Sequence, residues 1–338
     1  MKQIDLRSDT VTKPSTAMKE AMMAAKVGDD VYGEDPTVNE LEALAANMLG
    51  TQDAIFCASG TQSNLLALMT HCERGDEYIV GQHAHTYKYE GGGAAVLASI
   101  QPQPLDFEED GTLNLEKVSQ FIKPDDIHFA NTKLLCLENT MAGKVLPLEY
   151  LKKAKTIADD NDLSFHLDGA RVFNAAIRLK VDVKEITHCF DTISCCLSKG
   201  LGAPVGSLLC GSKKQIKKAR RWRKVLGGGM RQAGFLAGAG MHALLNNIQR
   251  LEQDHDNALA LAKGLNEINN NNIHINMKIV QTNMVFADID ADMTTLYKFL
   301  KQKGIIIDTG SHLRLVTHLD ISKRDIDYTI QAFKDFFL

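Results

Sequence analysis

Short apolar runs alternate with longer segments of helical periodicity through the first two thirds of the chain. One example is Ala54–Cys57, which is followed from Thr61 by a helical pattern. The other predicted strands of this region are Tyr78–Val80, Ala95–Leu97, Leu134–Leu137, Leu163–Asp168, Thr192–Leu197 and Ser207–Cys210, with a helical pattern at 149–160. Strands interleaved with helices predict βαβ units and a mostly parallel sheet covered on both faces. Functional groups of such sheets gather at the carboxyl ends of the strands.

The last third of the chain follows a different pattern. A long helical pattern from about Phe235 to Leu265 predicts a bridge into a second unit, and the asparagine-rich stretch Asn266–Asn276 predicts a loop. Beyond it lie predicted strands at Lys278–Val280, Met284–Ala287, Gly304–Ile307 and His312–Val316, and helical patterns at 293–303 and 322–337. These elements predict a small α+β domain. We therefore expect an N-terminal segment, 1–28, that packs on the rest of the chain or on a partner subunit, a large domain, 29–245, and a small C-terminal domain, 246–338.

Composition and charge narrow the class of protein. The 338 residues are 44% apolar and 24% charged, which is typical of a soluble globular enzyme, and the net charge of −4 gives no general attraction to nucleic acid or anionic membranes. No apolar run reaches the roughly 18 to 20 residues that span a bilayer, and the first residues lack the apolar core of a signal peptide. The seven cysteines include no C-x-x-C pair, which indicates buried thiols in a reducing compartment. We expect a cytoplasmic protein.

Lys199 is the first candidate for chemistry. It follows the predicted strand Thr192–Leu197 and stands among Gly200, Gly202 and Gly206. A lysine amine becomes a nucleophile when burial or a neighbouring cation lowers its pKa, and glycines let a flat group approach the backbone closely. Taken alone, Lys199 is more simply explained as a surface lysine in a glycine-rich turn.

Two further segments change that interpretation. Asp168 closes a predicted strand about one βαβ step before Lys199, where a buried carboxylate needs a partner, such as the protonated ring nitrogen of pyridoxal phosphate (PLP). The segment Ala58–Asn64 lies between a strand and a helix, where free backbone N–H groups can bind a phosphate. The alternatives are a helix N-cap for Asp168 and ordinary capping by Ser59 or Thr61.

The order of these three segments along the chain is typical of one superfamily of enzymes. Ser59-Gly60-Thr61, Asp168–Arg171 and Ser198-Lys199-Gly200 together resemble the aspartate-aminotransferase-like superfamily of pyridoxal enzymes. Five longer segments resemble the low-specificity L-threonine aldolases: Ile4–Thr12, Gly28–Gly33, Leu137–Thr140, Cys196–Gly202 and Leu226–Gln232. The resemblance runs from about residue 4 to beyond Asp320. It implies an α/β fold of the PLP-dependent transferase fold type I, with PLP as cofactor and no metal site.

The resemblance also implies roles for single residues at the cofactor. Lys199 would hold PLP as a Schiff base, and Asp168 would pair with the ring nitrogen. Gly60 and Thr61 would seat the phosphate, and Arg171 would bind near the ring hydroxyl and the substrate.

One histidine would stack on the cofactor ring and is a candidate for the catalytic base. His85 matches the family position because of its spacing to Glu90-Gly91-Gly92, whereas His83 stays unassigned. His128 would lie near the substrate hydroxyl; it, His85 and a water molecule are the alternatives for the base.

The remaining candidates would bind the substrate or join subunits. Arg314, flanked by apolar residues, would bind the substrate carboxylate with its guanidinium fork, and Ser8 would be a second contact. Tyr32 would reach into a neighbouring subunit's site.

A basic segment, 213–224, ends close to the last two candidates. Lys224 and Arg231 would support the cofactor and the subunit interface, while the segment as a whole indicates a solvated helix face rather than a nucleic-acid patch.

The implied reaction is retro-aldol cleavage of L-threonine, L-allo-threonine and related β-hydroxy-α-amino acids to glycine and an aldehyde. The family also implies a homotetramer, a dimer of dimers with shared active sites. The alternatives are another pyridoxal lyase, β-eliminating or serine-directed, and a catalytically idle scaffold of the same fold. The sequence leaves the preference between the threonine diastereomers open.

Overall fold

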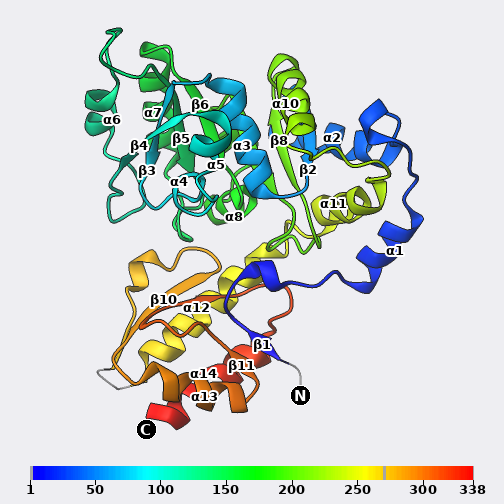
Figure 1. The fold of residues 1–338 in the computed structure, drawn as a ribbon. Coiled ribbons are helices and arrows are strands. Elements are labelled where there is room, and N and C mark those ends of the chain that lie inside the picture. The colour runs from blue at the N-terminus through cyan, green and yellow to red at the C-terminus, as the bar shows by residue number, and fades with distance from the viewer. Residues whose placement is uncertain (1–2, 269–271, 338) are drawn as a thin grey trace.

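A seven-stranded sheet forms the centre of the protein in a computed structural model, which describes residues 3–268 and 272–337 (Figure 1). The strands follow the spatial order β2 (Asp53–Cys57), β8 (Ser207–Gly211), β7 (Thr192–Cys196), β6 (Ser164–Asp168), β5 (Thr132–Glu138), β3 (Glu77–Gly81) and β4 (Gln101–Leu105). Every neighbouring pair is parallel except the two pairs that β8 makes. The predicted mostly parallel sheet is confirmed.

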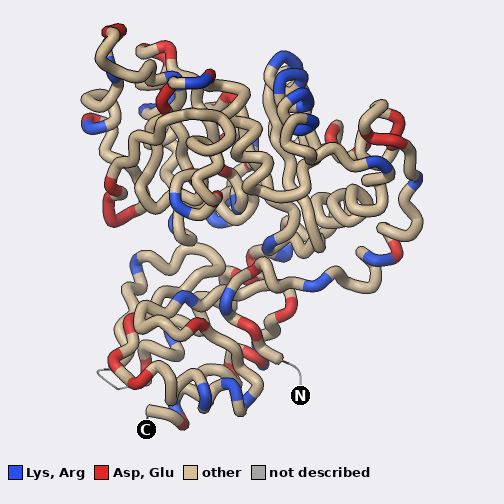
Figure 2. The backbone as a smooth tube through the Cα atoms, viewed as in Figure 1, with Lys and Arg blue, Asp and Glu red and all other residues tan. Residues whose placement is uncertain are grey.

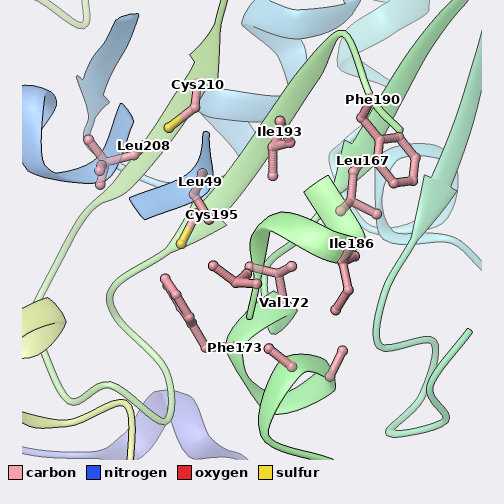
Figure 3. Close-up of a cluster of buried hydrophobic side chains, with 14 of the residues drawn as sticks. Leu49, Leu167, Val172, Phe173, Ile186, Phe190, Ile193, Cys195, Leu208 and Cys210 are labelled. Carbon is pink, nitrogen blue, oxygen red and sulfur yellow. The ribbon is translucent and has the colours of Figure 1, made fainter. Parts of the chain in front are cut away.

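Helices cover the sheet on both faces, which explains why its central strands are buried along their whole length. These helices are α2 (Pro36–Leu49), α3 (Gly60–His71), α4 (His85–Lys88), α5 (Gly93–Ala98), α6 (Leu115–Phe121), α7 (Leu148–Asp160), α8 (Val172–Leu179), α9 (Lys184–Thr187), α10 (Lys213–Val225) and α11 (Gly234–Asn246). Figure 3 shows part of the main core, where Leu167, Ile193 and Leu208 of the sheet lie near Val172 and Phe173 of α8.

The carboxyl ends of the central strands meet at one edge of the sheet. Glu138 of β5 lies opposite Asp168 of β6, and Asp168 lies opposite Ser194 of β7. Lys199 follows the end of β7, and His85 follows the end of β3. Residues distant in sequence therefore converge on this edge.

A smaller unit lies below this edge in Figure 1. It contains an antiparallel sheet of β12 (His312–Val316), β10 (Met284–Ile289) and β9 (Ile273–His274), packed with α12 (Leu251–Asn266), α13 (Met293–Gln302) and α14 (Lys323–Phe337). The N-terminal strand β1 (Ile4–Asp5) pairs in parallel with β11 (Ile305–Ile306) of this unit. Ile4 and Leu6 are buried in its core, so both ends of the chain contribute to it. The domain boundaries at 28 and 245 stay a prediction.

Short elements connect the N-terminal strand to the large unit. They are the 3-10 turn Asp9–Val11, helix α1 (Thr16–Ala24) and the 3-10 turn Asp30–Tyr32. Helix α1 packs along α11, so the segment spans both units.

Three predicted elements were wrong. Ala95–Leu97 lies in helix α5, and the actual edge strand β4 contains Pro102 and Pro104, which hid it. The long helix expected from Phe235 to Leu265 is two helices, α11 and α12, and Asn247 in the break donates its Nδ2 to the Leu201 carbonyl at 2.8 Å. Lys278–Val280 belongs to a 3-10 turn, Met277–Ile279, and its end. The predicted loop, Asn266–Asn276, contains strand β9, so that prediction was wrong there, and residues 269–271 lie outside the described residues.

The surface and the thiols agree with the sequence analysis. Figure 2 shows the basic segment as a band of Lys and Arg along α10, with Ile216 and Ala219 on the buried side. All seven cysteines are buried and unbridged. Within residues 3–268 and 272–337, no helix combines the length and apolar character needed to cross a membrane.

Candidate active site

A cavity of about 750 Å³ lies at the carboxyl edge of the large sheet, against the small unit. Its wall includes Lys199, His85 and Arg171 of the large unit, Ser8 of the N-terminal segment and Arg314 of β12. The structure therefore brings five of the predicted site residues together. The other lining residues are Thr10, His83, Lys88, Tyr89, Phe107, Glu138, Met141, Ala142, Lys144, Met284, Phe286 and His312.

The backbone around Lys199 is held from two sides. Its carbonyl accepts hydrogen bonds from Thr12 Oγ1 at 3.2 Å and from the Gly202 N–H at 2.8 Å. Packing within the chain gives a further reason for glycine at positions 200 and 202. A Cβ on Gly200 would lie 2.9 Å from Leu251 Cδ2, and one on Gly202 would lie 2.5 Å from Leu319 Cδ2. The glycines admit apolar side chains that pack against this turn, and the expectation that they also make room for a flat cofactor stays a prediction.

Asp168 is a buried carboxylate at the end of β6. Its Oδ2 accepts from Asn64 Nδ2 at 2.8 Å, and its Oδ1 accepts from the Ala170 N–H at 3.0 Å. Among the described residues, no lysine or arginine forms an ion pair with it. A buried carboxylate bonded only to neutral donors is costly, and a bound cationic group would offset that cost. The site therefore fits a protonated pyridine nitrogen.

His85 is flanked by two acidic side chains. Its Nδ1 lies 2.8 Å from Glu90 Oε1, and its backbone N–H donates to Glu138 Oε2 at 2.8 Å. The hydrogen bond to Glu90 raises the pKa of His85. Burial, together with the nearby Asp168 carboxylate, raises the pKa of Glu138 to about 7. His83 also lines the cavity, with its Nδ1 3.3 Å from Lys88 Nζ, so His85 is the one linked to the buried acids.

The turn predicted to bind an anion lies at the start of helix α3. Ser59 caps the helix by accepting the Gln62 N–H at 3.2 Å, so the alternative of capping by Ser59 is confirmed. A Cβ on Gly60 would lie 2.7 Å from Cys196 Sγ, so a side chain there would collide with β7. A Cβ on Gly228 would meet the Gln62 side chain at 2.0 Å, which places the glycine loop 227–229 beside this turn.

Arg171 is held by an acidic residue of the N-terminal segment. Its Nε and Nη2 donate to Asp9 Oδ2 and Oδ1 at 2.8 and 2.6 Å, and Asn283 Nδ2 of the small unit donates to the same carboxylate at 3.2 Å. Burial alone would raise the pKa of Asp9, but Arg171 outweighs burial and lowers it to about 2. This junction ties three parts of the chain together beside Lys199.

Arg314 and Ser8 lie on the small-unit side of the cavity. Arg314 Nη2 donates to the Arg7 carbonyl at 3.0 Å, while its Nε is buried and has no hydrogen-bond partner among the described residues. Because the Arg314 side chain lines the cavity, its guanidinium group is placed to bind an incoming carboxylate. Ser8 Oγ accepts from the Thr10 N–H at 3.2 Å and lies in the same wall.

The other predicted site residues lie elsewhere in this chain. His128 precedes β5, at the opposite end of the parallel strands from the cavity, with its side chain 77% exposed and bonded to Asp126. Tyr32 and Lys224 line a separate cavity of about 440 Å³, and Arg231 pairs with Asp29 at 2.8 Å and stacks over Tyr32. One subunit does not bring these four residues to Lys199.

Several buried polar residues near the cavity were missed. Asp9 and Glu138 stand inside segments that carried the family resemblance, Ile4–Thr12 and Leu137–Thr140, so the signal was present. Asn64 and Glu90 also lie in segments that the sequence analysis used, Ala58–Asn64 and Glu90-Gly91-Gly92, but the contacts they make are visible only in the folded chain.

The comparisons with known proteins agree with this site. A sequence model of the beta-eliminating lyase family matches residues 5–292. The chain therefore belongs to the beta-eliminating lyase family. The low specificity L-threonine aldolase of Escherichia coli (strain K12) is 56% identical over 324 residues, which cover 96% of both chains. The low-specificity L-threonine aldolase 1 of Arabidopsis thaliana is 44% identical and covers 99% of this chain and 96% of its own. Within the family, this chain takes its place among the low-specificity L-threonine aldolases.

Solved structures confirm the fold. The threonine aldolase of Leishmania major superposes with a TM-score of 0.84 at 19% identity and covers 99% of this chain and 100% of its own. The serine palmitoyltransferase of S. paucimobilis, solved with PLP bound, has a TM-score of 0.75 at 18% identity and covers 98% and 87%. The chain has the predicted PLP-dependent transferase fold type I.

Proposed function

We propose that this protein is a PLP-dependent lyase that cleaves L-threonine, L-allo-threonine and related β-hydroxy-α-amino acids to glycine and an aldehyde. One observation carries the proposal: Asp168, a buried carboxylate without a cationic partner in the described chain, stands one strand away from the strand that leads to Lys199. Relatives named low-specificity L-threonine aldolases, at up to 56% identity in the matches given above, support the reaction.

The residues of the large unit would hold the cofactor. Lys199 would bind it covalently, Asp168 would pair with the ring nitrogen, and the free N–H groups at Gly60 and Thr61 would bind the phosphate. His85 would lie against the ring. When bound, PLP accepts the electrons released as a bond at the substrate Cα breaks.

The residues of the opposite wall would orient the amino acid. The Arg314 guanidinium group would bind the substrate carboxylate, and Ser8 of the same cavity wall would be a second contact. Arg171 has Nε and Nη2 engaged by Asp9, so its Nη1 is the atom left for the ring hydroxyl or the substrate. Fixing the carboxylate selects which Cα bond stands perpendicular to the ring and breaks.

His85 would accept the proton of the β-hydroxyl group. With Nδ1–H donated to Glu90, the neutral ring keeps Nε2 as its acceptor. The raised pKa makes His85 a stronger base near neutral pH, where general base catalysis is most effective. The aldehyde forms as the proton leaves and the Cα–Cβ bond breaks.

We further propose a cytoplasmic homotetramer, a dimer of dimers in which one subunit completes the site of another. Val96 and Leu97 of α5 are apolar yet 76% and 57% exposed, and Tyr32 is exposed on the other side of the large unit. His128 lies too far around the fold for its own cavity, so its catalytic role requires a second copy. Lys224, Arg231 and Tyr32, beside the glycine loop near Gln62, would serve a shared site in the same way.

A second lyase reaction on the same scaffold is β-elimination, which the name of the family describes. The products separate the two reactions, because aldol cleavage of L-threonine gives acetaldehyde and glycine, whereas elimination gives a keto acid and ammonia. Both diastereomers of threonine should be supplied to the PLP-loaded protein and all four products measured. Acetaldehyde and glycine in equal amounts support the proposal, and keto acid with ammonia overturns it.

The control for this assay is the Lys199→Ala protein. It should lose turnover with both diastereomers while its unfolding transition stays close to that of the unsubstituted protein. Wild-type rates of acetaldehyde release from Lys199→Ala would overturn the assignment of Lys199.

A further inference from the structure

Asn64 lies between the two acidic groups that the proposed site depends on. It belongs to α3 and is buried, and its Nδ2 donates to Asp168 Oδ2 and to Glu90 Oε1, each at 2.8 Å. Ligand atoms of His85, Glu90 and Asp168 all lie within 4.8 Å of one another. One amide group therefore separates two carboxylates that would otherwise repel each other at short range.

The orientation of the Asn64 amide follows from its neighbours. Two carboxylates can only accept, so the NH₂ group faces them and Oδ1 faces away. Oδ1 lies 3.3 Å from His166 Nε2, so that nitrogen carries the proton and donates. The reversed amide would direct its oxygen at both carboxylates.

His166 is itself fixed from the far side. Its Nδ1 lies 2.8 Å from Thr192 Oγ1, and that hydroxyl lies 2.8 Å from His71 Nε2. Burial lowers the pKa of His166 to about 3 and that of His71 to about 4, so both rings are neutral. His166 Nδ1 also lies 3.1 Å from the Thr192 carbonyl oxygen. A neutral His166 that donates from Nε2 accepts the Thr192 hydroxyl proton at Nδ1, whereas the tautomer with its proton on Nδ1 would donate to that carbonyl and leave Nε2 unprotonated. The two carboxylates beside Asn64 favour the first tautomer, because they require the NH₂ group and leave Oδ1 for His166.

We propose that Asn64 is a positioning residue that clasps Asp168 and Glu90, and that His166, held by Thr192 and His71, supports the clasp by donating to Asn64 Oδ1. The inference rests on the proposed function, because the two residues that Asn64 holds take their roles from it. Asp168 would pair with the cofactor ring, and Glu90 is the hydrogen-bond partner of the proposed base, His85. The clasp stabilises both carboxylates as anions in a buried place. Removing it takes a buried donor from each carboxylate and leaves both side chains free to turn away, which weakens the hold on PLP and alters the electronic state of the bound ring.

The first test compares Asn64→Ala with Ser63→Ala. Ser63 is the adjacent residue on α3, fully buried, and its Oγ donates to the Leu208 carbonyl at 3.2 Å, away from both acids. The dissociation constant for PLP and the absorbance spectrum of the bound cofactor should be measured for both. We expect Asn64→Ala to bind PLP about 10- to 100-fold more weakly and with a shifted absorbance maximum, the range for loss of a hydrogen bond to a charged group. Ser63→Ala should keep the spectrum of the unsubstituted protein.

The second test addresses the support that His166 gives to the clasp. His166→Phe removes the donor to Asn64 Oδ1, whereas His166→Gln can present an amide N–H from a similar position. We expect His166→Phe to weaken PLP binding and shift the spectrum in the same direction as Asn64→Ala, and His166→Gln to restore much of both. This pair also decides the matter if Asn64→Ala fails to fold.

Three outcomes would overturn the clasp. The first is Asn64→Ala protein that binds PLP as tightly as Ser63→Ala, with an unshifted spectrum. The second is equal PLP affinity and equal spectra for His166→Phe and His166→Gln. The third is an unsubstituted protein that takes up no PLP, which overturns the proposed function as well. If the unsubstituted protein binds PLP and cleaves threonine, and the variants have the same PLP affinity and spectrum, only the clasp is overturned.

Discussion

The ion pair between Asp9 and Arg171 shows how much of the site depends on single buried contacts. Arg171 was predicted from the resemblance, but its partner was not, because the two residues are 162 positions apart in the sequence and meet only in the folded chain. The same holds for Glu90 and His85, whose carboxylate and ring meet across a short loop. The residues at the strand ends could be predicted from the sequence. The buried acids that tune them stand in segments of the family resemblance, but their contacts could not be predicted.

Replacing Asp9 tests the first of these contacts. Asp9→Asn leaves the Arg171 guanidinium buried without a counter-charge, so we expect it to lower the free energy of unfolding by about 3 to 5 kcal/mol at neutral pH. Urea unfolding measures this. Asp5→Asn, which breaks the exposed pair with Arg7, is the control and should cost less than about 1 kcal/mol.

The same carboxylate predicts a pH dependence. Its pKa falls from 3.8 to about 2 on folding, so its contribution is present above pH 4 and is lost as the pH drops towards 2. The loss amounts to about 2 kcal/mol. The free energy of unfolding of the unsubstituted protein and of Asp9→Asn should be measured between pH 4 and pH 2. Two curves that run parallel over this interval would contradict the predicted role of the Asp9 carboxylate.

Glu90 should set the acid limb of the pH–rate profile. Glu90→Gln keeps an oxygen that can accept from His85 Nδ1 but removes the charge, so the raised pKa of His85 falls back. Since the base must be unprotonated, the acid limb of kcat/KM should move to lower pH, and the rate on the plateau should fall because the base is weaker. The control is His83→Asn, because His83 is not hydrogen-bonded to the buried acids, and it should leave the acid limb at the same pH. An acid limb that does not move in Glu90→Gln would exclude His85 as the base.

At the scale of elements, the buried strands of the sheet were predicted well and the exposed elements were not. Strands β2, β3, β5 and β8 carry short continuous apolar runs because both of their faces are covered. Strands β6 and β7 are buried as well, although His166 and Ser194 interrupt their apolar residues. Helix α5 carries the same kind of run, Ala95–Leu97, but its Val96 and Leu97 side chains are exposed. The hydrophobic pattern alone cannot distinguish such a short run in a helix from a buried strand. Strand β4, with prolines at alternate positions, is possible only because it lies at the edge of the sheet.

The packing of α12 on α14 gives a test at this scale. Gly264 lies in α12, where alanine normally favours a helix by up to about 1 kcal/mol. A Cβ there would lie 2.4 Å from Ile330 Cδ1 and 2.9 Å from its Cγ1, so Gly264→Ala should instead destabilise the protein by about 1 to 3 kcal/mol. Gly93→Ala, where the nearest atom would be 3.6 Å away, should be neutral or slightly stabilising in the same urea series.

Across the whole molecule, the first residues of the chain complete the core formed by the last ones. β1 pairs with β11, and Ile4 and Leu6 are buried among residues of α12 to α14. Ser8 and Asp9 follow at once, so the wall of the cavity and the junction with Arg171 depend on this pairing. The sequence suggested that residues 1–28 pack on the rest of the chain, but no local pattern could identify the strand that receives them.

Leu6→Ala should therefore affect stability and binding together. Removing this fully buried side chain should cost about 2 to 5 kcal/mol, because the cavity it leaves is lined by a rigid core. The KM for L-threonine should rise, since Ser8 loses its fixed position. Leu245→Ala, on an exposed site of α11, is the control for side-chain loss; a Leu6→Ala protein with unchanged KM would show that the N-terminal segment does not shape the site.

The central claim is that Lys199 carries the cofactor, opposite a carboxylate at Asp168 that binds its ring. Treating the PLP-loaded protein with borohydride and digesting it for mass spectrometry tests this most directly. The account predicts one reduced phosphopyridoxyl adduct, on the peptide that contains Lys199, and its loss in Lys199→Ala. A protein that stays colourless with PLP, or an adduct found on another lysine, would contradict it.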